Sequence, residues 1–328
     1  MSSYGNTTDD IVAVIDGDEI AFTIAAACET RTIKATNKLN QESSSFKHRT
    51  ELKKFLHGLE VPDDFYDVAD VQVADDIANA CHSVKVSIDN IKQACKADKI
   101  EVYLSGKDNF RDSLPLPTKY KGSRTDTIKP ILLSEIRAYI VKKYNAKIVD
   151  GEEVDDVVCH RMWDGYKSGQ KIIGVTVDKD ALSNSGWLYN RDKMVEPEYI
   201  DGLGELTIDG KNKVRGKGRK WGYLQWIIGD STDSYNPSEV AKVKYGEKSA
   251  YKLLAPLQTD KECIQVVYEL YKTWYPAEVK YTAWDGTEVV TDAVGMMQMY
   301  MDCYRMRRYR TDIVYVKDVL TNLGINYE

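Results

Sequence analysis

The chain has 328 residues, of which 43% are hydrophobic, enough for a sizeable core in one large domain or in a main domain with a smaller annex. This composition excludes collagen-like, disordered and disulfide-scaffold proteins, and no apolar run approaches the ~20 residues that span a bilayer, so we expect no membrane partner. The polar, acidic start lacks a signal-peptide pattern, which predicts an intracellular, cytoplasmic protein, and the net charge of −6 argues mildly against nucleic acid as a partner.

Short apolar runs alternate with segments of helical periodicity along the first half of the chain. In chain order, the pattern predicts a strand at 12–15, a helix at 75–97, a strand at 101–104, a helix at 130–144, a strand at 146–149, a helix at 154–163 and a strand at 171–177. Residues 30–74 are mixed and polar, and we interpret them as an irregular insertion with a short helix near residues 51–59. The alternation predicts an α/β fold with a central, mostly parallel, twisted sheet and helices on both faces.

The second half of the chain changes character. Residues 187–221 are rich in glycine and charge, which predicts strands and a basic hairpin at about 205–221. Beyond residue 222 the pattern is mainly helical. We therefore predict an α/β core over residues 1–222 and a helical C-terminal region over residues 223–328.

Acidic residues follow each of the predicted strands and also occur near residue 230. In an open parallel sheet, ligands bind beyond the carboxyl ends of the strands, so we expect these acids to converge on one place. Converging carboxylates repel one another unless a cation compensates their charge. The candidate metal ligands are Asp16, Asp18, Asp108, Glu153, Asp155, Asp156, Asp178, Asp180, Asp230 and Asp233.

The kind of ligand indicates the kind of metal. Carboxylates are hard oxygen ligands, which favour Mg²⁺, with Mn²⁺ as a substitute. The chain has six cysteines without a closely spaced pair and only four histidines, which argues against zinc. Two ions about 3.5–4 Å apart can activate a water molecule and stabilise the leaving oxygen of a phosphodiester. The sequence therefore predicts a metal-dependent phosphodiesterase with two or more ions in its active site.

Five motifs occur in an order that resembles flap endonuclease-like nucleases, which are related to PIN domains. They are Ile15–Glu19 (Ile-Asp-Gly-Asp-Glu), Tyr120–Arg124 (Tyr-Lys-Gly-Ser-Arg), Glu153–Asp156 (Glu-Val-Asp-Asp), Val177–Asp180 (Val-Asp-Lys-Asp) and Ile228–Ser234 (Ile-Gly-Asp-Ser-Thr-Asp-Ser). The forms Asp-Gly-Asp, Asp-Lys-Asp and Gly-Asp-x-Thr-Asp resemble the phage 5′→3′ exonucleases of the T7 type most. The resemblance implies the fold of this superfamily, with a helix–hairpin–helix-like DNA-binding segment in the C-terminal region.

The same resemblance implies an activity. We expect a metal-dependent 5′→3′ exonuclease that hydrolyses DNA, preferably double-stranded, with flap endonuclease or RNase H-type activity in addition. Its partner would be DNA with a free 5′ end, and its role would be phage DNA replication or recombination in the cytoplasm of a bacterial host. No protein partner follows from the sequence.

Three other readings stay open. A PIN-type ribonuclease has a similar acidic cluster but is shorter and lacks the Tyr-Lys-x-x-Arg motif. A non-catalytic DNA-binding protein on this fold would have lost acidic ligands, whereas this chain retains them. A nucleotide-binding α/β protein is disfavoured because no Gly-x-Gly-x-x-Gly or Walker motif follows a predicted strand.

The resemblance also implies roles for individual residues. The first metal cluster would consist of Asp16, Asp108, Glu153, Asp155 and Asp156, and the second of Asp178, Asp180, Asp230 and Asp233. Asp18 lies outside the general pattern and is either a further ligand or a helix cap. Lys121 and Arg124 would lie over the scissile phosphate and offset the charge that develops in the transition state. The segment at about 120–131 would be the family's arch, under which a 5′ single strand passes.

Further residues are candidate DNA contacts. They are Tyr120 in the arch motif, then Lys211, Lys213, Arg215, Lys217 and Arg219 near the basic hairpin, and Gly246, Lys248 and Ser249 in the helix–hairpin–helix-like segment. A solvated surface loop is the alternative for the basic hairpin. Residues 236–240 replace the family's glycine-rich turn, so a K⁺ site at the helical hairpin stays an open alternative. The arginines at 305–310 are expected on a C-terminal helix, where nearby methionines favour core packing.

Overall fold

The protein is described by a computed structural model that covers residues 10–59, 61–124 and 127–327. These residues form two compact units. The larger unit comprises Met1–Asp18, Asp89–Thr127 and Ala146–Glu328, and the smaller unit comprises Glu19–Ile88 and Ile128–Asn145. Residues 125 and 126 of the predicted arch lie outside the described residues. The division into regions at residue 222 stays a prediction.

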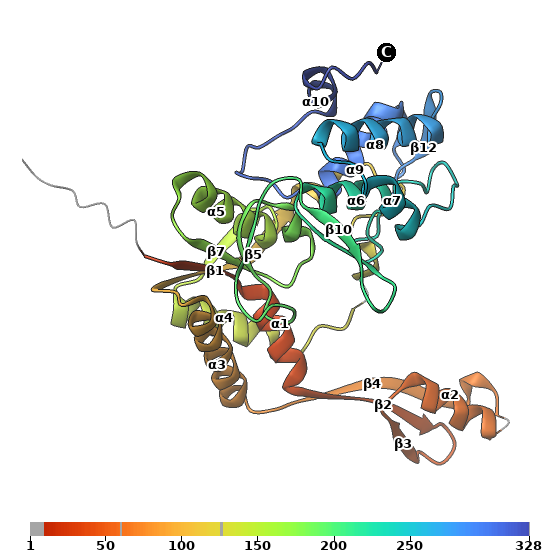
Figure 1. Ribbon diagram of the computed structural model, residues 1–328. Helices are drawn as coiled ribbons and strands as arrows, with labels where there is room; N and C mark the ends of the chain where they lie inside the picture. Colours follow the sequence, from red (N-terminus) through yellow and green to blue (C-terminus); the bar gives the residue numbers. More distant parts are fainter. Residues whose placement is uncertain (1–9, 60, 125–126, 328) are drawn as a thin grey trace, which may run out of the picture. The chain divides into compact units, whose positions relative to one another are not determined.

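A six-stranded sheet forms the centre of the larger unit (Figure 1). Its strands, in spatial order, are β6 (Lys147–Gly151), β5 (Lys99–Asn109), β1 (Val12–Asp16), β7 (Ile172–Val175), β8 (Gly186–Tyr189) and β9 (Glu198–Ile200). All neighbouring pairs are parallel except β8 and β9. The sheet is flanked by helices, and the predicted α/β fold with a mostly parallel sheet is confirmed.

Strand β1 is buried and lies in the interior of the sheet, between β5 and β7. Every residue of Val12–Asp16 is buried, as expected for a strand covered on both faces. The chain leaves β1 to form β5 and β6 on one side and returns to form β7 on the other. This reversal of strand order between β1 and β7 creates the crevice in which open α/β sheets bind their ligands.

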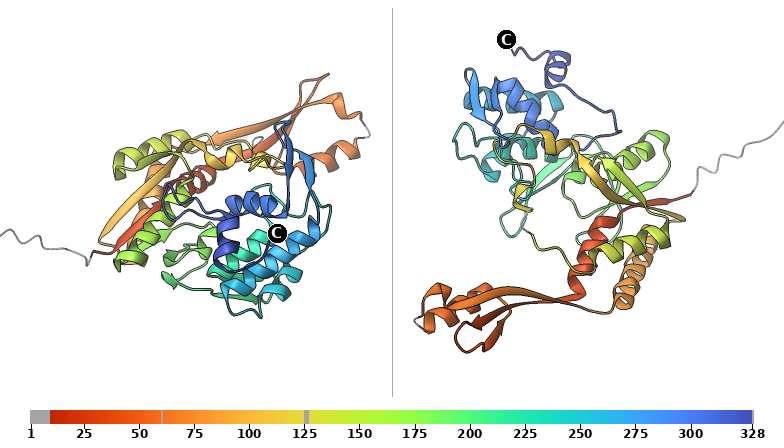
Figure 2. Two further views of the ribbon diagram at one scale, coloured as in Figure 1. Left: turned by 90° about the horizontal axis from the view of Figure 1, so that it is seen from above. Right: turned by 180° about the vertical axis from the view of Figure 1, so that it is seen from behind.

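The helices of the larger unit lie on the sheet and in a C-terminal cluster. Helix α5 (Val154–Ser168) packs against the central strands, where Val158 and Met162 are buried. The C-terminal cluster, teal to blue in both views of Figure 2, contains α6 (Arg219–Ile228), α7 (Glu247–Leu254), α8 (Asp260–Trp274), α9 (Ala293–Tyr304) and α10 (Val316–Asn322). Short 3-10 helices occur at Phe110–Ser113, Gly122–Arg124 and Asp180–Ser183.

Two hairpins accompany these helices. The basic hairpin consists of β10 (Glu205–Ile208) and β11 (Val214–Lys217). A second hairpin, β12 (Val279–Thr282) and β13 (Glu288–Thr291), lies in the region expected to be helical. The helix expected at 305–310 was wrong, because α9 ends at Tyr304 and Arg305 already has an extended backbone. The methionines of α9 are buried, as expected.

The smaller unit contains a three-stranded antiparallel sheet in the order β3 (Ser43–Phe46), β2 (Glu29–Asn37) and β4 (Tyr66–Ala74). Helices α2 (Arg49–Gly58) and α4 (Leu133–Tyr144) and a 3-10 turn at Asp63–Phe65 belong to the same unit, and α1 (Gly17–Ala27) and α3 (Ile77–Cys95) run from one unit into the other. The interpretation of residues 30–74 as irregular was therefore wrong, although their short helix is confirmed. Within the described residues, no helix combines the length and the apolar surface that crossing a membrane requires.

Candidate active site

The acids converge because four separate elements end at the same edge of the sheet. Asp16 is the last residue of β1, and Glu153 is the N-cap residue of α5, which follows β6. Asp178 and Asp180 follow β7, and Asp180 is the first residue of a 3-10 helix. Asp230 and Asp233 occupy the turn after α6. This edge is the carboxyl end of the parallel strands, where the sequence predicted a site.

Three of these acids form a compact group. One carboxylate oxygen from each of Asp180, Asp230 and Asp233 lies within 4.8 Å of the others, and the exposed fractions of the three residues are 3%, 8% and 7%. Gly229, which precedes Asp230, has φ +71°, and a Cβ there would lie 2.4 Å from the carbonyl oxygen of Tyr235. Only glycine fits this turn, which positions Asp230.

Asp178 connects this group to a second set of acids. Burial, together with repulsion from Asp178, Asp16 and Glu153, raises the pKa of Asp155 well above its usual range. Burial and repulsion from Asp178 also raise the pKa of Asp180. A raised pKa means that the charged form of these carboxyls is disfavoured, and a divalent cation with oxygen ligands would stabilise that form. The residues therefore fit one or more such ions.

Comparison with known proteins addresses the fold. No family model matches the chain, and no curated protein matches it. Among solved structures, it is similar to the D15 protein of bacteriophage T5, co-crystallised with metal ions, with a TM-score of 0.51 over 95% of this chain and 96% of that one at 12% identity. The chain has a phage flap endonuclease-like fold. A complex of the T5 D15 flap endonuclease with DNA and metal ions gives a TM-score of 0.47 at 12% identity, over 95% and 99% of the two chains.

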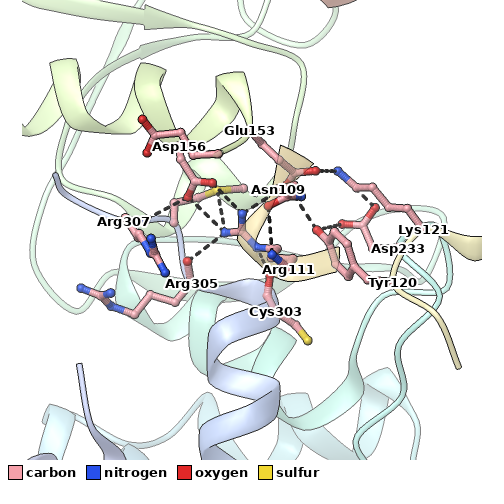
Figure 3. Close-up of polar contacts among 12 residues, drawn as sticks. Asn109, Arg111, Tyr120, Lys121, Glu153, Asp156, Asp233, Cys303, Arg305 and Arg307 are labelled. Atoms are coloured by element: carbon pink, nitrogen blue, oxygen red, sulfur yellow. Dashed lines mark hydrogen bonds and ion pairs between the residues drawn. The ribbon is translucent and has the colours of Figure 1, made fainter. Parts of the chain in front are cut away.

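Within this flap endonuclease-like fold, Asp156 is turned away from the cluster. Its Oδ2 accepts a hydrogen bond from Nη1 of Arg111 at 2.5 Å, and its Oδ1 accepts from Nη2 of Arg111 and from the backbone N–H of Arg307, both at 3.1 Å (Figure 3). Although burial alone would raise the pKa of Asp156, Arg111 holds it below its usual value. Both oxygens are engaged, so Asp156 supports the site through Arg111.

Asp18 and Asp108 also lie outside the group. The Oδ2 of Asp18 accepts a hydrogen bond from the backbone N–H of Ser105 at 2.6 Å, which ties the start of α1 to β5. Asp108 is exposed, and within the described ranges its side chain makes no hydrogen bond or ion pair. The structure thus brings together Asp16, Glu153, Asp155, Asp178, Asp180, Asp230 and Asp233.

The Tyr-Lys-x-x-Arg motif lies against these acids (Figure 3). Lys121 forms an ion pair with Glu153 and lies 3.9 Å from Asp233, and Arg124 donates to Asp233 Oδ1 at 2.8 Å. Tyr120 is buried and its hydroxyl donates to Asp233 Oδ2 at 3.0 Å, so it faces the acids and not the solvent. The motif therefore brings two cations to the acidic site.

The sequence interpretation did not identify two side chains that contact these acids, Lys179 and Arg111. Lys179 forms an ion pair with Asp230 at 2.9 Å, and this contact lowers the pKa of Asp230 although burial alone would raise it. Its position between two predicted ligands, Asp178 and Asp180, was the available signal. Arg111 is fully buried and also donates to the carbonyl oxygens of residues 303 and 305 at 3.0 and 3.1 Å.

Apart from Tyr120, the candidate DNA contacts lie on the basic hairpin and at the starts of α6 and α7. Lys211, Lys213, Arg215 and Lys217 are exposed on the basic hairpin (Figure 1, β10), although Arg215 pairs with Asp209 at 2.9 Å. Arg219, the first residue of α6, makes two hydrogen bonds of 2.7 Å to Asp260. Gly246 is the N-cap of α7, and Lys248 and Ser249 are exposed in its first turn. The role of each in DNA binding stays a prediction.

Metal binding should be measurable without any substrate. Mg²⁺ or Mn²⁺ is expected to raise the melting temperature, because a ligand at 100 times its Kd stabilises the folded state by about 2.7 kcal/mol. Asp230→Asn should remove most of this shift, whereas Asp318→Asn, an exposed acid of α10, should leave it unchanged. Thermal unfolding in chelator and in metal tests this, and equal shifts in both variants would show that the cluster does not hold the ion.

Proposed function

We propose that the chain is a divalent-metal-dependent 5′→3′ exonuclease that hydrolyses phosphodiester bonds of DNA. The observation that carries this proposal is the buried group of Asp180, Asp230 and Asp233, with oxygens within 4.8 Å of one another and cationic side chains beside it. The flap endonuclease-like fold supports it, since the similar T5 D15 protein was crystallised with metal ions. A PIN-type ribonuclease would instead cleave RNA and leave DNA intact.

The ligands divide into two sets in this proposal. Asp178, Asp180, Asp230 and Asp233 would hold one ion, and Asp16, Glu153 and Asp155 would hold a second with Asp178 between them. Bound Mg²⁺ would supply an activated water molecule and Lewis-acid stabilisation of the leaving oxygen. Tyr120 would hold Asp233 in place through its 3.0 Å hydrogen bond. The Lys179 ammonium would orient Asp230 in the same way.

Lys121 and Arg124 would act on the substrate. Both contact acids of the cluster, so their charges lie within one side-chain length of the place where a phosphate would bind. Positive charge at this position stabilises the negative charge that develops on the phosphate oxygens. Lys121 is held with φ +52°, and its backbone N–H donates to the carbonyl oxygen of Asp233 at 2.8 Å. These contacts fix the ammonium relative to the ligands.

The preference for a 5′ end would come from the segments around the acids. The segment at about 120–131 would act as the arch that admits a single strand. The N-terminus of α7, with Gly246, Lys248 and Ser249 exposed, would hold the duplex backbone, because helix N-termini bind phosphate. The products would be mononucleotides or short oligonucleotides released from the 5′ end.

The proposal predicts a specific defect for Lys121→Ala. If the ammonium acts mainly in the transition state, the single-turnover cleavage rate should fall by about 100-fold or more, as when one oxyanion-stabilising donor is removed, while DNA affinity changes much less. Lys119→Ala is the matched control, since Lys119 is an exposed lysine two positions away that lies over the Trp284 ring. Equal losses in rate and affinity would assign Lys121 to binding alone, and absence of DNA cleavage in Mg²⁺ by the wild type would refute the proposed function.

A further inference from the structure

A second cationic region lies in the larger unit, where the segment after α9 meets the start of α6. A cavity of about 250 Å³ is present there. Its lining includes three arginines and three aromatic residues, Arg219, Arg305, Arg308, Tyr223, Trp226 and Tyr304. None of the acids of the active site lines this cavity. Within the described residues, two of the three guanidinium groups have a carboxylate partner, and the third, on the exposed Arg308, has none.

Arg219 and Arg305 each have a carboxylate partner. Arg219 makes two hydrogen bonds of 2.7 Å to Asp260, and Arg305 forms an ion pair with Asp312. Arg308 has no such partner: within the part of the chain that the structure describes, no carboxylate lies within ion-pair distance of its guanidinium. Desolvation and the neighbouring positive charges of Arg305 and Arg219 lower the pKa of Arg308, although the charge of Asp312 acts in the opposite direction.

The position of Arg308 is nevertheless fixed. Its guanidinium carbon lies 4.5 Å from the centre of the Trp163 ring, and that ring stacks on Tyr166 with centroids 5.0 Å apart and an interplanar angle of 15°. Its backbone N–H donates to Asp312 at 2.9 Å. A guanidinium is planar, and contact with an aromatic ring restricts its orientation, which suits two-point recognition of phosphate oxygens. The exposed Arg308 guanidinium thus lies against Trp163 and is accessible to an anion.

We propose that this cavity, whose lining excludes the acids of the active site, binds a phosphate group of a DNA strand through Arg308. The DNA source rests on the proposed function, and a free mononucleotide is the other source of the same chemistry. The cavity also includes Ser183, which ends the 3-10 helix begun by Asp180, so the bound phosphate would lie beside the acidic site and not in it.

Binding of fluorescently labelled duplex DNA in chelator tests this, because cleavage is then absent. Arg308→Gln should weaken binding and reduce the slope of log K against log salt by about 1, the value for one phosphate contact. Arg308→Lys should recover much of that slope, since it retains the charge. Lys193→Gln is the control, because Lys193 is exposed in the loop between β8 and β9 and lies outside the cavity. Unchanged thermal unfolding would verify that each variant is folded.

An Arg308→Gln protein with the affinity and salt slope of the wild type would overturn the inference. Competition by a 5′-mononucleotide separates the two sources. If the mononucleotide binds the wild type and not Arg308→Gln, while DNA affinity is the same in both, DNA is not the ligand of this cavity. If Arg308→Gln weakens DNA binding but the wild type cleaves no DNA in Mg²⁺, the inference stands and the proposed function fails.

Discussion

Asp180→Asn is expected to lower the rate of DNA cleavage in Mg²⁺ by at least about 100-fold, because a catalytic metal supplies several kcal/mol of transition-state stabilisation and each 1.36 kcal/mol is a factor of ten. The same change should stabilise the metal-free fold at neutral pH. Burial and Asp178 raise the pKa of Asp180 above 3.8, so its contribution to stability is lost as the pH rises from 3.8 through the raised value. The side chain introduced by Asp180→Asn does not ionise, so the variant avoids this loss of stability.

Two measurements check this result together. Single-turnover cleavage in Mg²⁺ gives the rate, and urea unfolding in chelator at several pH values gives the stability. Asp318→Asn is the matched control, because Asp318 is an exposed acid in the first turn of α10. Cleavage by Asp180→Asn at the wild-type rate would remove Asp180 from the set of metal ligands. A loss of stability in chelator would contradict the repulsion inferred for this group.

Arg111→Ala is expected to lower the free energy of unfolding by about 3–5 kcal/mol, the cost of leaving one partner of a buried ion pair alone. The Arg111 side chain is fully buried, and its partner Asp156 is fully buried as well. The change also removes the donors to the carbonyl oxygens of residues 303 and 305, which join the end of α9 to the 3-10 helix after β5 (Figure 3). Urea unfolding measures the loss.

A double-mutant cycle with Asp156→Asn isolates the pair. Because neighbouring residues couple, the double variant should lose less stability than the sum of the two single variants. The control is Arg49→Ala, which breaks an exposed pair with Asp70 at 2.6 Å and should cost about 1 kcal/mol or less. A loss below about 1 kcal/mol for Arg111→Ala would show that the buried pair is not what holds Asp156 in place.

The fold was predictable where burial leaves a continuous signal. The strand β1 is apolar except for its last residue, and α3 and α5 carry apolar residues at helical spacing. The sheet of the smaller unit gives no such signal. In β2 only Ile33 and Ala35 are buried, and β4 has no fully buried residue. Two apolar residues are too few to distinguish a strand from a loop.

The acidic site was predictable from topology, since acids at the carboxyl ends of parallel strands must converge. The direction of each side chain was not. Asp155 and Asp156 are adjacent in the first turn of α5, where successive side chains point about 100° apart. One therefore faces Asp178, and the other faces Arg111. The sequence motif places both residues near the site but does not show which side chain faces the metal position. Arg111 was missed because its role depends on the direction of the Asp156 side chain.

The most direct test of the proposed exonuclease uses duplex DNA labelled at either end, incubated with Mg²⁺ or with chelator. We expect early release of the 5′ label as mononucleotides or short oligonucleotides, late release of the 3′ label, and no release in chelator. A bulky adduct on the 5′ end should block the reaction, because only a free 5′ strand would enter the predicted arch. Early release of the 3′ label, undiminished cleavage of the blocked end, or full activity in chelator would contradict it.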